Sequence, residues 1–563
     1  MFAVLTQDVR YGLRTLARTP GFTLVALITL ALGIGATTTV FTIVEAVLFR
    51  PPGFQDPERL VGLFTANPGR GMHRLSTSSE DFSDWRGQSK AFVDMGLYLF
   101  DACNLTGGDR PARALRVRAS ASLLPVLGFD ARIGRRFGPE HEEPQEQQVV
   151  LLSDTFWQQR FGADPDVVGE TLLLDNVPYS ILGVLPPELE RAWSTFDVWI
   201  PLVPGPEMLG RGNRWFDVYG RLRPGVSLAQ AQSEMRDVAA RLEQTYPSSN
   251  KGRTAEVIPI MDLMIGSSSK SALLFLSLSA ACVLLISCTN VANLLLARGT
   301  ARQREYAIRS ALGATRARVT CQLITESAVL ALVSGAFGVG LAMGGVRILM
   351  HFLSDRIGEP NEVTINGAVL LFALVISLVA SLLFGIAPAF RISRVGSNEA
   401  LKESGQSASP SPRNQYARES LVVAQLALAL ALVICAGLMI KSLLVLQSVD
   451  PGFDTQQLLT MRFTLPGGTY DSETKRAAFF EEVMERIRCV PGVQSAAAVS
   501  AIPLVGRASE SQVTVEDYVP PNDPNGGPMV GNTVVTPAYF STLGIPIVRG
   551  RDFTGIGGSE ATS

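Results

Sequence analysis

The sequence is poor in the residues that usually build catalytic and metal sites. Among 563 residues it has only three histidines, His73, His141 and His351, and six cysteines. It contains no HExxH, GxSxG or paired-cysteine motif, so neither a zinc site nor a nucleophile elbow can be assembled from motifs. We therefore expect no catalytic residue, no cofactor and no metal ion. The polar segment 140–143 (EHEE) is interpreted as a solvated loop rather than a metal site.

Further absences exclude other classes of protein. The net charge is -2, and no basic tract with interleaved aromatic residues occurs in the polar regions, which excludes nucleic acid as a partner. No GxxxxGK phosphate loop is present, so the sequence offers no motif of that type for holding ATP. Cys103 and Cys489 lie outside the apolar segments. We expect both to be buried free thiols, with a bridge between them as the alternative.

Long apolar segments, by contrast, are abundant. The mean hydropathy is +0.23 and 18% of the residues are charged, which is too apolar for an ordinary soluble enzyme and too polar for a chain wholly within a membrane. A helix needs about 20 apolar residues to cross the hydrocarbon core of a bilayer. Five segments of sufficient length predict membrane helices: residues 22–48, 271–297, 323–353, 368–390 and 421–446.

Arginine positions predict the orientation of the chain in the membrane. Residues 1–21, the connection 298–322 and the linker 391–420 are rich in basic residues, so we expect them on the cytoplasmic side. The polar regions 50–270 and 447–563 then face outward. Residues 1–21 also predict an interfacial amphipathic helix, because an apolar stripe opposes a basic one. The apolar stripe is Leu5, Val9, Leu13 and Leu16, and the basic stripe is Arg10, Arg14 and Arg18.

The chain carries an internal duplication. Each repeated unit begins with an apolar segment followed by a polar region, which predicts a tandem arrangement of two related units. The repeated residues are Leu127, Gly128, Gly134, Arg135 and Phe137, which recur as Leu543, Gly544, Gly550, Arg551 and Phe553, and Pro52, Gly53, Phe54 and Leu60, which recur as Pro451, Gly452, Phe453 and Leu459. A complete second unit would need roughly 250 further residues by analogy with the first. We therefore expect a fragment that is unstable beyond residue 447.

The first outward region mixes strands with helices, which predicts an α+β domain. Ser78, followed three residues later by Asp81, predicts a helix that runs through Phe82, Trp85 and Phe92. Segments 149–152, 171–174 and 179–184 predict short strands, the last two joined by a turn at residues 175–176. A further amphipathic helix is predicted after a capping serine, Ser227, with an apolar face of Leu228, Ala231, Met235, Val238 and Leu242.

Three stretches carry a family resemblance. They are YGLR and TPGF at 11–14 and 19–22; the spaced residues VVL, WxxxFG and GVLP within 149–186; and NVANLLLAR at 290–298 leading into REYAIRSALGATR at 304–316, the most specific of the three. These stretches resemble the MacB/FtsX-type permeases of ABC transporters, in particular their duplicated orphan branch. The resemblance covers essentially the whole chain. It implies a polytopic α-helical membrane protein with MacB-like extracytoplasmic core domains at 50–270 and 447–563, the second incomplete, and an FtsX-like permease domain at 271–390.

The resemblance also implies a function and a site. The chain would be the permease subunit of a transporter of the cell (inner) membrane whose separate ATP-binding subunit drives motion of the extracytoplasmic domains. The substrate would be a drug, a peptide or a lipoprotein. Membrane lipids and an extracytoplasmic adaptor or hydrolase are further candidate partners. The residues implied to contact the ATP-binding subunit are Arg304, Glu305, Ile308, Arg309, Ala311, Leu312, Gly313 and Arg316.

A second group of residues is predicted to pack helices against one another. Asn290 and Asn293 can form hydrogen bonds across membrane helices, and Gly335, Gly340 and Gly344 include a GxxxG spacing that permits close backbone approach. Two other functions stay open. The chain could be a non-transporting FtsX-like regulator that activates an extracytoplasmic cell-wall hydrolase, or a membrane-anchored enzyme, for which the sequence offers no catalytic cluster.

Overall fold

The computed structural model describes most of the chain as two units. The described residues are 2–49, 53–107, 112–143, 145–193, 196–301, 316–357, 365–394, 412–455, 458–466, 469–470, 472–503, 509–512 and 529–553. One unit, here called the helical unit, comprises residues 1–63, 222–233 and 256–443. The other, the sheet unit, comprises residues 64–221, 234–255 and 444–563.

Long helices build the helical unit. They are α1 (Phe2–Arg18), α2 (Pro20–Val44), α9 (Ile260–Ala301), α11 (Arg316–Ile357), α12 (Gly367–Arg394) and α14 (Pro412–Gln447). Four of the five predicted membrane segments lie within one of these helices, and segment 22–48 runs from α2 into the helical turn that follows it, because long runs of apolar residues favour helix. A π-helix, Glu45–Phe49, extends α2, so the segment 22–48 ends in π rather than α geometry. Gly266, with a φ of 68°, interrupts α9 before its apolar part begins.

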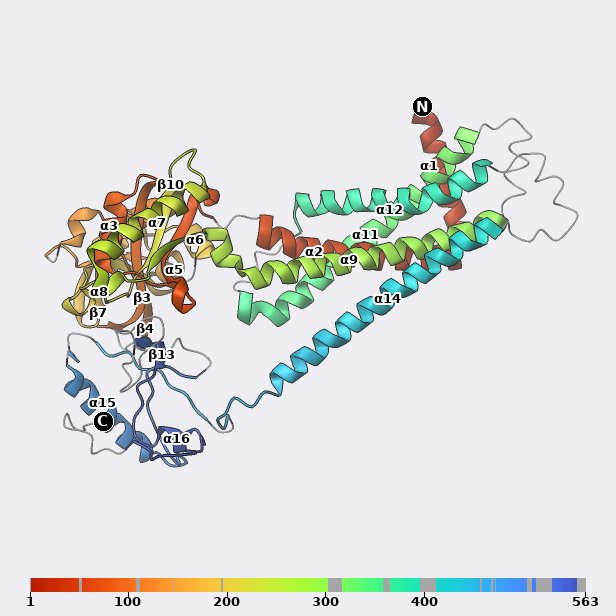
Figure 1. The fold of residues 1–563 in the computed structure, drawn as a ribbon. Helices are drawn as coiled ribbons and strands as arrows, with labels where there is room; N and C mark the ends of the chain where they lie inside the picture. The colour runs from red at the N-terminus through yellow and green to blue at the C-terminus, as the bar shows by residue number, and fades with distance from the viewer. Residues whose placement is uncertain are drawn as a thin grey trace, which may run out of the picture. The chain divides into compact units, whose positions relative to one another are not determined.

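Several of these helices are long and apolar enough to cross a membrane. Among the described residues, the candidate spans are Pro20–Leu48, Ser269–Leu295, Thr320–Ile348 and Val422–Gln447, whereas the apolar stretch Gly367–Leu383 is shorter. Helices α2, α9, α11 and α12 pack on one another (Figure 1), and α11 contacts both α2 and α12. Helix α14 contributes no buried residue to its apolar span, whereas 39% of the α2 span is buried. The number of membrane crossings stays a prediction.

A mixed β-sheet organises the first polar region. Its strands follow the order β11-β1-β10-β3-β4-β9-β6-β8-β5, with β2 paired to β1 and β7 paired to β3 and β8. The strands are β1 (Leu60–Asn67), β2 (Met72–Leu75), β3 (Phe92–Thr106), β4 (Ala112–Ala119), β5 (Ile133–Gly134), β6 (Val149–Leu152), β7 (Thr171–Leu174), β8 (Val177–Val184), β9 (Val198–Pro201), β10 (Asp217–Leu222) and β11 (Thr254–Pro259). The pair β3 and β4 is antiparallel, whereas β4 and β9 are parallel.

Short helices and turns connect these strands (Figure 1). The helices are α3 (Ser79–Gln88), α4 (Leu123–Leu127), α5 (Asp154–Phe161), α6 (Pro187–Ala192), α7 (Leu228–Thr245) and α8 (Pro247–Asn250), with 3-10 turns at Pro57–Arg59, Pro68–Arg70, Pro139–Glu142, Pro165–Val167 and Pro206–Met208. This mixture confirms the α+β prediction.

Local sequence signals are largely confirmed here. The Ser78 hydroxyl accepts a hydrogen bond from the Asp81 backbone N–H at 3.1 Å and begins α3. The predicted strands 149–152 and 171–174 are β6 and β7, and the turn at Asp175 and Asn176 takes left-handed backbone angles. The prediction that the α3 helix includes Phe92 is wrong. Helix α3 ends at Gln88 because Ser89 adopts an extended conformation, and Phe92 begins β3.

The last described segments of the sheet unit are shorter. They include α15 (Glu473–Arg488), the hairpin of β12 (Ser509–Gln512) and β13 (Met529–Asn532), and α16 (Tyr539–Thr542). The repeated glycines share backbone geometry. Gly128 and Gly544 have φ values of 87° and 69°, and Gly134 and Gly550 have values of 74° and 92°. Glycine adopts this left-handed region without steric cost, which explains why the duplication preserves these positions.

Candidate functional site

The residues implied to contact an ATP-binding subunit fall mainly outside the structural description. Arg304, Glu305, Ile308, Arg309, Ala311, Leu312 and Gly313 lie outside the described residues, and Arg316 is described only as the backbone start of α11. Helix α9 ends at Ala301 and α11 begins at Arg316, so this segment joins two long helices of the helical unit. Its contact with a partner stays a prediction.

The two predicted helix-packing asparagines differ in their surroundings. The Gln425 side-chain amide donates a hydrogen bond to the side-chain oxygen Oδ1 of Asn290 at 2.8 Å, and this bond joins α14 to α9. The Asn293 carbonyl oxygen is buried and has no hydrogen-bond partner among the described residues. A buried acceptor without a donor carries a desolvation cost, so burying the Asn293 side-chain oxygen is less favourable than burying the hydrogen-bonded oxygen of Asn290.

The glycines that bring helices together are not all the predicted ones. A Cβ atom on Gly335 would overlap the Ser377 hydroxyl of α12, so this residue does mediate a helix contact. A Cβ atom on Gly340 or Gly344 would meet nothing within 4 Å. The GxxxG pair Gly340 and Gly344 therefore faces open space within this chain, and the prediction that it packs helices here is corrected.

Another close contact between helices brings the backbones of α2 and α11 together at glycines that were not predicted. A Cβ atom on Gly35 of α2 would lie 3.0 Å from the Gly338 carbonyl oxygen of α11. A Cβ atom on Gly338 would lie 3.1 Å from the Ala31 carbonyl oxygen. Further along the same two helices, a Cβ atom on Gly345 of α11 would lie 3.2 Å from the Thr39 hydroxyl oxygen of α2. The motif search missed these positions because Gly35 and Gly338 are complementary between two helices, whereas GxxxG is a spacing within one helix.

The carboxyl-terminal end of α2 is joined to the start of α12 by a polar contact. Asn366 caps α12, since its side-chain oxygen accepts the Val369 N–H at 3.0 Å. Its side-chain amide donates to the Glu45 carboxylate, also at 3.0 Å. Glu45 is buried and is the first residue of the π-helix. A single π-helical turn within a longer helix often marks a functional site.

An ion pair joins α1 to the first turns of α11. Arg318 donates from both terminal guanidinium nitrogens to the Asp8 carboxylate, at 2.7 and 2.5 Å. Asp8 is buried, with a side-chain exposure of 7%. Two-pronged arginine–carboxylate pairs of this kind combine charge with fixed geometry. Helix α1 is therefore held at the end of α11 that follows the predicted coupling segment.

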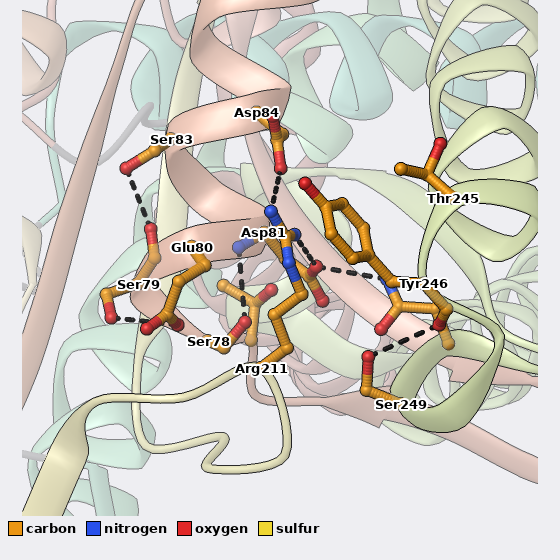
Figure 2. Close-up of polar contacts among 12 residues, drawn as sticks. Ser78, Ser79, Glu80, Asp81, Ser83, Asp84, Arg211, Thr245, Tyr246 and Ser249 are labelled. Carbon is orange, nitrogen blue, oxygen red and sulfur yellow. Dashed lines mark hydrogen bonds and ion pairs between the residues drawn. The ribbon is translucent and has the colours of Figure 1, made fainter.

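A buried ion network organises one end of the sheet unit (Figure 2). The Asp81 carboxylate accepts hydrogen bonds from Arg211 and Arg214, each at 2.8 Å, and from Asn250 at 3.0 Å. Arg211 also pairs with Asp84, and its guanidinium lies 3.6 Å from the centre of the Tyr246 ring. Asp81 thus joins α3, the loop before β10 and α8. The network positions backbone segments and contains no arrangement suited to covalent chemistry.

Burial shifts the pKa of two other side chains, Cys103 and Arg253. Burial raises the pKa of the Cys103 thiol to about 12, so it is a protonated and unreactive core residue. Cys103 and Cys489 are both free thiols, but Cys489 is exposed, so the expectation that both are buried is wrong for Cys489. Burial, with a smaller effect of Arg214, lowers the pKa of the Arg253 guanidinium to about 10.

The segment 140–143 is more ordered than a solvated loop. His141 is 3% exposed, and its Nδ1 accepts the Gly138 N–H at 3.1 Å, while Glu142 accepts the Ala121 N–H at 2.6 Å. The prediction of a fully solvated segment is therefore wrong, because these hydrogen bonds hold it against the domain. The described part of the chain contains no group of three or more His, Cys, Asp or Glu side chains placed to hold a metal ion.

Comparison with known proteins identifies the family. The family model of the MacB-like periplasmic core domain matches residues 23–238, and that of the FtsX-like permease C-terminal region matches residues 277–396. The chain belongs to the MacB/FtsX-type permeases. The permease is similar to the macrolide export ATP-binding/permease protein MacB of Burkholderia thailandensis, with 28% identity over 282 residues, or 49% of this chain and 41% of that one. The MacB protein of Escherichia coli is 29% identical over 287 residues, or 50% of this chain and 42% of that one.

The permease thus spans about two fifths of the length of these curated relatives. Among solved structures it matches the periplasmic region of MacB from Actinobacillus actinomycetemcomitans. That match covers 39% of this chain and 95% of the other, with 15% identity and a TM-score of 0.30.

Proposed function

We propose that this MacB/FtsX-type permease is the membrane subunit of an ABC transporter and works with a separate ATP-binding subunit. The curated relatives are named ATP-binding/permease proteins, and no GxxxxGK motif occurs in this sequence. The ATP-binding function would then come from another chain. The segment 304–316 is the proposed contact, with Ile308 and Leu312 as its apolar anchors and Arg304, Arg309 and Arg316 as its charged rim.

The connection between this segment and the packed helices carries the proposal. Helices α9 and α11 leave the two ends of the segment, and both pack against α2. Strand β11 runs into α9 without an intervening loop, since β11 ends at Pro259 and α9 begins at Ile260. We infer that a displacement of the segment would pass along the apolar part of α9 as far as the break at Gly266, beyond which a short helical stretch leads back to β11. Helices transmit such motion because their backbone hydrogen bonds resist compression and stretching.

The proposed transport is mechanical. Thr38 of α2 and Ser334 of α11 are polar side chains of the helical unit that are fully buried. We infer that ATP-driven motion of the extracytoplasmic domains extracts or expels a substrate outside the hydrocarbon core. The substrate would be a drug, a peptide or a lipoprotein, with an extracytoplasmic adaptor as a further partner. In this orientation α1 lies on the cytoplasmic side.

Photo-crosslinking tests the partnership. A photoreactive amino acid at Ile308 or Leu312, introduced into the full chain in native membranes, is expected to capture an ATP-binding subunit identified by mass spectrometry. Leu209, which is 51% exposed in the sheet unit, is the control position and should capture no such subunit. Failure of both Ile308 and Leu312 to capture an ATP-binding protein, with the permease confirmed by intact mass, would overturn the proposal. Capture of a cell-wall hydrolase at Leu209 would favour the regulatory alternative.

A further inference from the structure

Helix α1 has a buried side that differs from its apolar stripe. Asp8, Gly12 and Thr15 are its buried residues, and they recur every three or four positions, so they share one helix face. This face lies against α11. A Cβ atom on Gly12 would be 3.7 Å from the Glu326 Cα atom, and Asp8 pairs with Arg318. The helix is therefore attached to α11 by a small, polar face.

The arginine face of α1 is exposed, whereas its apolar stripe is exposed only in part, since Leu16 packs against the core that includes Leu30. Leu13 is 49% exposed, and Val9 is only partly buried. Arg10, Arg14 and Arg18 are all exposed. Since successive helical residues are rotated by about 100°, the arginine side opposes the apolar stripe as a whole, and Leu13 is the residue of that stripe nearest to Arg10. Neither side coincides with the Asp8 face.

We propose that α1 binds anionic phospholipid headgroups of the cytoplasmic leaflet through Arg10, Arg14 and Arg18, with Leu13 inserted among the acyl chains. The side of the membrane rests on the function proposed above. An exposed leucine together with three exposed arginines on one short helix fits a lipid surface, which offers hydrocarbon and negative charge at adjacent depths. A lipid surface is favoured over a protein partner because α2, a candidate membrane span, begins two residues after α1 ends.

The attachment of α1 gives this lipid contact a consequence. The Asp8–Arg318 ion pair holds α1 to the first turn of α11, the turn that follows the predicted coupling segment. Headgroup binding by α1 would therefore restrict the position of the start of α11. A membrane rich in anionic lipid would stabilise this end of the helix, and a neutral membrane would leave it more mobile.

Hydrogen–deuterium exchange of the full chain in nanodiscs tests lipid binding without an ATP-binding subunit. We expect amide exchange in residues 2–18 to be slower in discs with one third phosphatidylglycerol than in pure phosphatidylcholine. Each basic residue near an anionic surface contributes roughly a fivefold gain in binding, so three arginines give a combined effect of order a hundredfold. The variant with Arg10, Arg14 and Arg18 all changed to glutamine should lose the difference between the two lipids.

A matched control has the same change in net charge elsewhere. Arg160, Arg223 and Arg236 are exposed arginines of the first polar region, and changing all three to glutamine should leave the lipid effect on residues 2–18 unchanged. Equal exchange in both lipids for the native chain would overturn the proposal, as would persistence of the lipid effect in the α1 variant. Unchanged exchange in the β-strands of each variant verifies that it is folded.

The variant Asp8→Asn tests the connection to α11. The native chain should show slower exchange at residues 316–322 in anionic discs. Asp8→Asn removes the charge that binds Arg318, so α1 should still respond to phosphatidylglycerol while residues 316–322 no longer do. If residues 316–322 do not respond in the native chain, or respond equally in Asp8→Asn, the proposed transmission is wrong even where lipid binding is observed. Since no ATP-binding subunit is present, neither result depends on the proposed transporter partnership.

Discussion

The sheet unit and the helical unit bury different kinds of side chain. The sheet unit buries large apolar residues such as Trp85, Phe137 and Phe216. In the helical unit the closest contacts involve glycine and hydroxyl residues, as at Gly35, Gly338 and Ser377, while large residues such as Phe275 and Phe337 are exposed. The difference reflects the solvent for which each unit is suited. Water drives large apolar groups inward, whereas lipid tails are as apolar as leucine and leave close packing of small residues as the main gain.

The largest expected effect is in the sheet unit. Asp81→Ala removes the buried carboxylate shared by Arg211 and Arg214. Arg214, which is 9% exposed, then loses its carboxylate partner, whereas Arg211 keeps Asp84. Breaking one side of a buried ion pair costs about 3–5 kcal/mol. Thermal unfolding of the full chain in nanodiscs, followed by exchange in α3 and β10, should show a marked loss of stability.

An exposed ion pair in the same domain provides the control. Arg86 and Asp94 are 45% and 36% exposed, and such pairs contribute up to about 1 kcal/mol because water and salt screen them. Arg86→Ala should therefore have a much smaller effect than Asp81→Ala. Equal losses for the two variants would contradict the structural role given to the buried network.

The next largest effect distinguishes glycines of the helical unit. Gly338→Val places a Cβ atom 3.1 Å from the Ala31 carbonyl oxygen, and overpacking of this kind typically costs about 1–3 kcal/mol. Gly340→Val makes the same chemical change where nothing lies within 4 Å, so the stability should change by less than about 0.5 kcal/mol. The two variants are compared by thermal unfolding in nanodiscs. A greater loss for Gly340→Val would show that its open face packs against another molecule.

A smaller effect is expected at the carboxyl-terminal end of α2. Asn366→Ala removes both the cap of α12 and the hydrogen bond to Glu45, with an expected cost of about 1–2 kcal/mol. Asn366→Ser retains a capping oxygen but cannot donate as the amide does, so it should lose only part of that stability. Exchange at residues 42–49 and 367–371 separates the two contributions. Identical exchange in both variants would show that the contact with Glu45 adds nothing to the cap.

The smallest expected effect comes from the Cys103 thiol. Its pKa in the folded chain is raised from 9.0 to about 12 by burial, so the folded state keeps the proton to higher pH than the unfolded state does. The stability from this group is fully present below pH 9 and is lost as the pH rises toward 12. At pH 8 a maleimide reagent should modify exposed Cys489 and leave Cys103 unmodified, as measured by peptide mass spectrometry. Rapid modification of Cys103 in the folded chain would refute its burial.

Local patterns made much of the fold predictable. Ser78 and Asp81 identified a helix start, and the apolar face of α7 places Ala231, Met235 and Val238 in the core, although Leu228 is 38% exposed. These signals act within a few residues, where side-chain spacing directly reflects helix or strand geometry. The limit of α3 was missed because it depends on where β3 joins the sheet.

Candidate site residues were less predictable. The Asp8–Arg318 pair and the Gly35–Gly338 crossing join residues more than 300 positions apart, and no local motif reports which of many arginines or glycines meet. Gly340 and Gly344 match the GxxxG spacing, yet a Cβ atom on either would meet nothing within 4 Å. Asn290 accepts a hydrogen bond from Gln425, which lies on a helix that the sequence offered no reason to pair with α9.

The sequence by itself determined the family, the apolar segments, the α+β character of the first polar region and the positions of the duplicated glycines. These follow from composition, periodicity and backbone preference, which are properties of neighbouring residues. Only the tertiary structure decided which face of α1 is buried, which glycines allow helices to approach, and which carboxylate joins three segments of the sheet unit. Such choices depend on side chains distant in sequence meeting at a few ångströms, where packing and desolvation select one pairing among many.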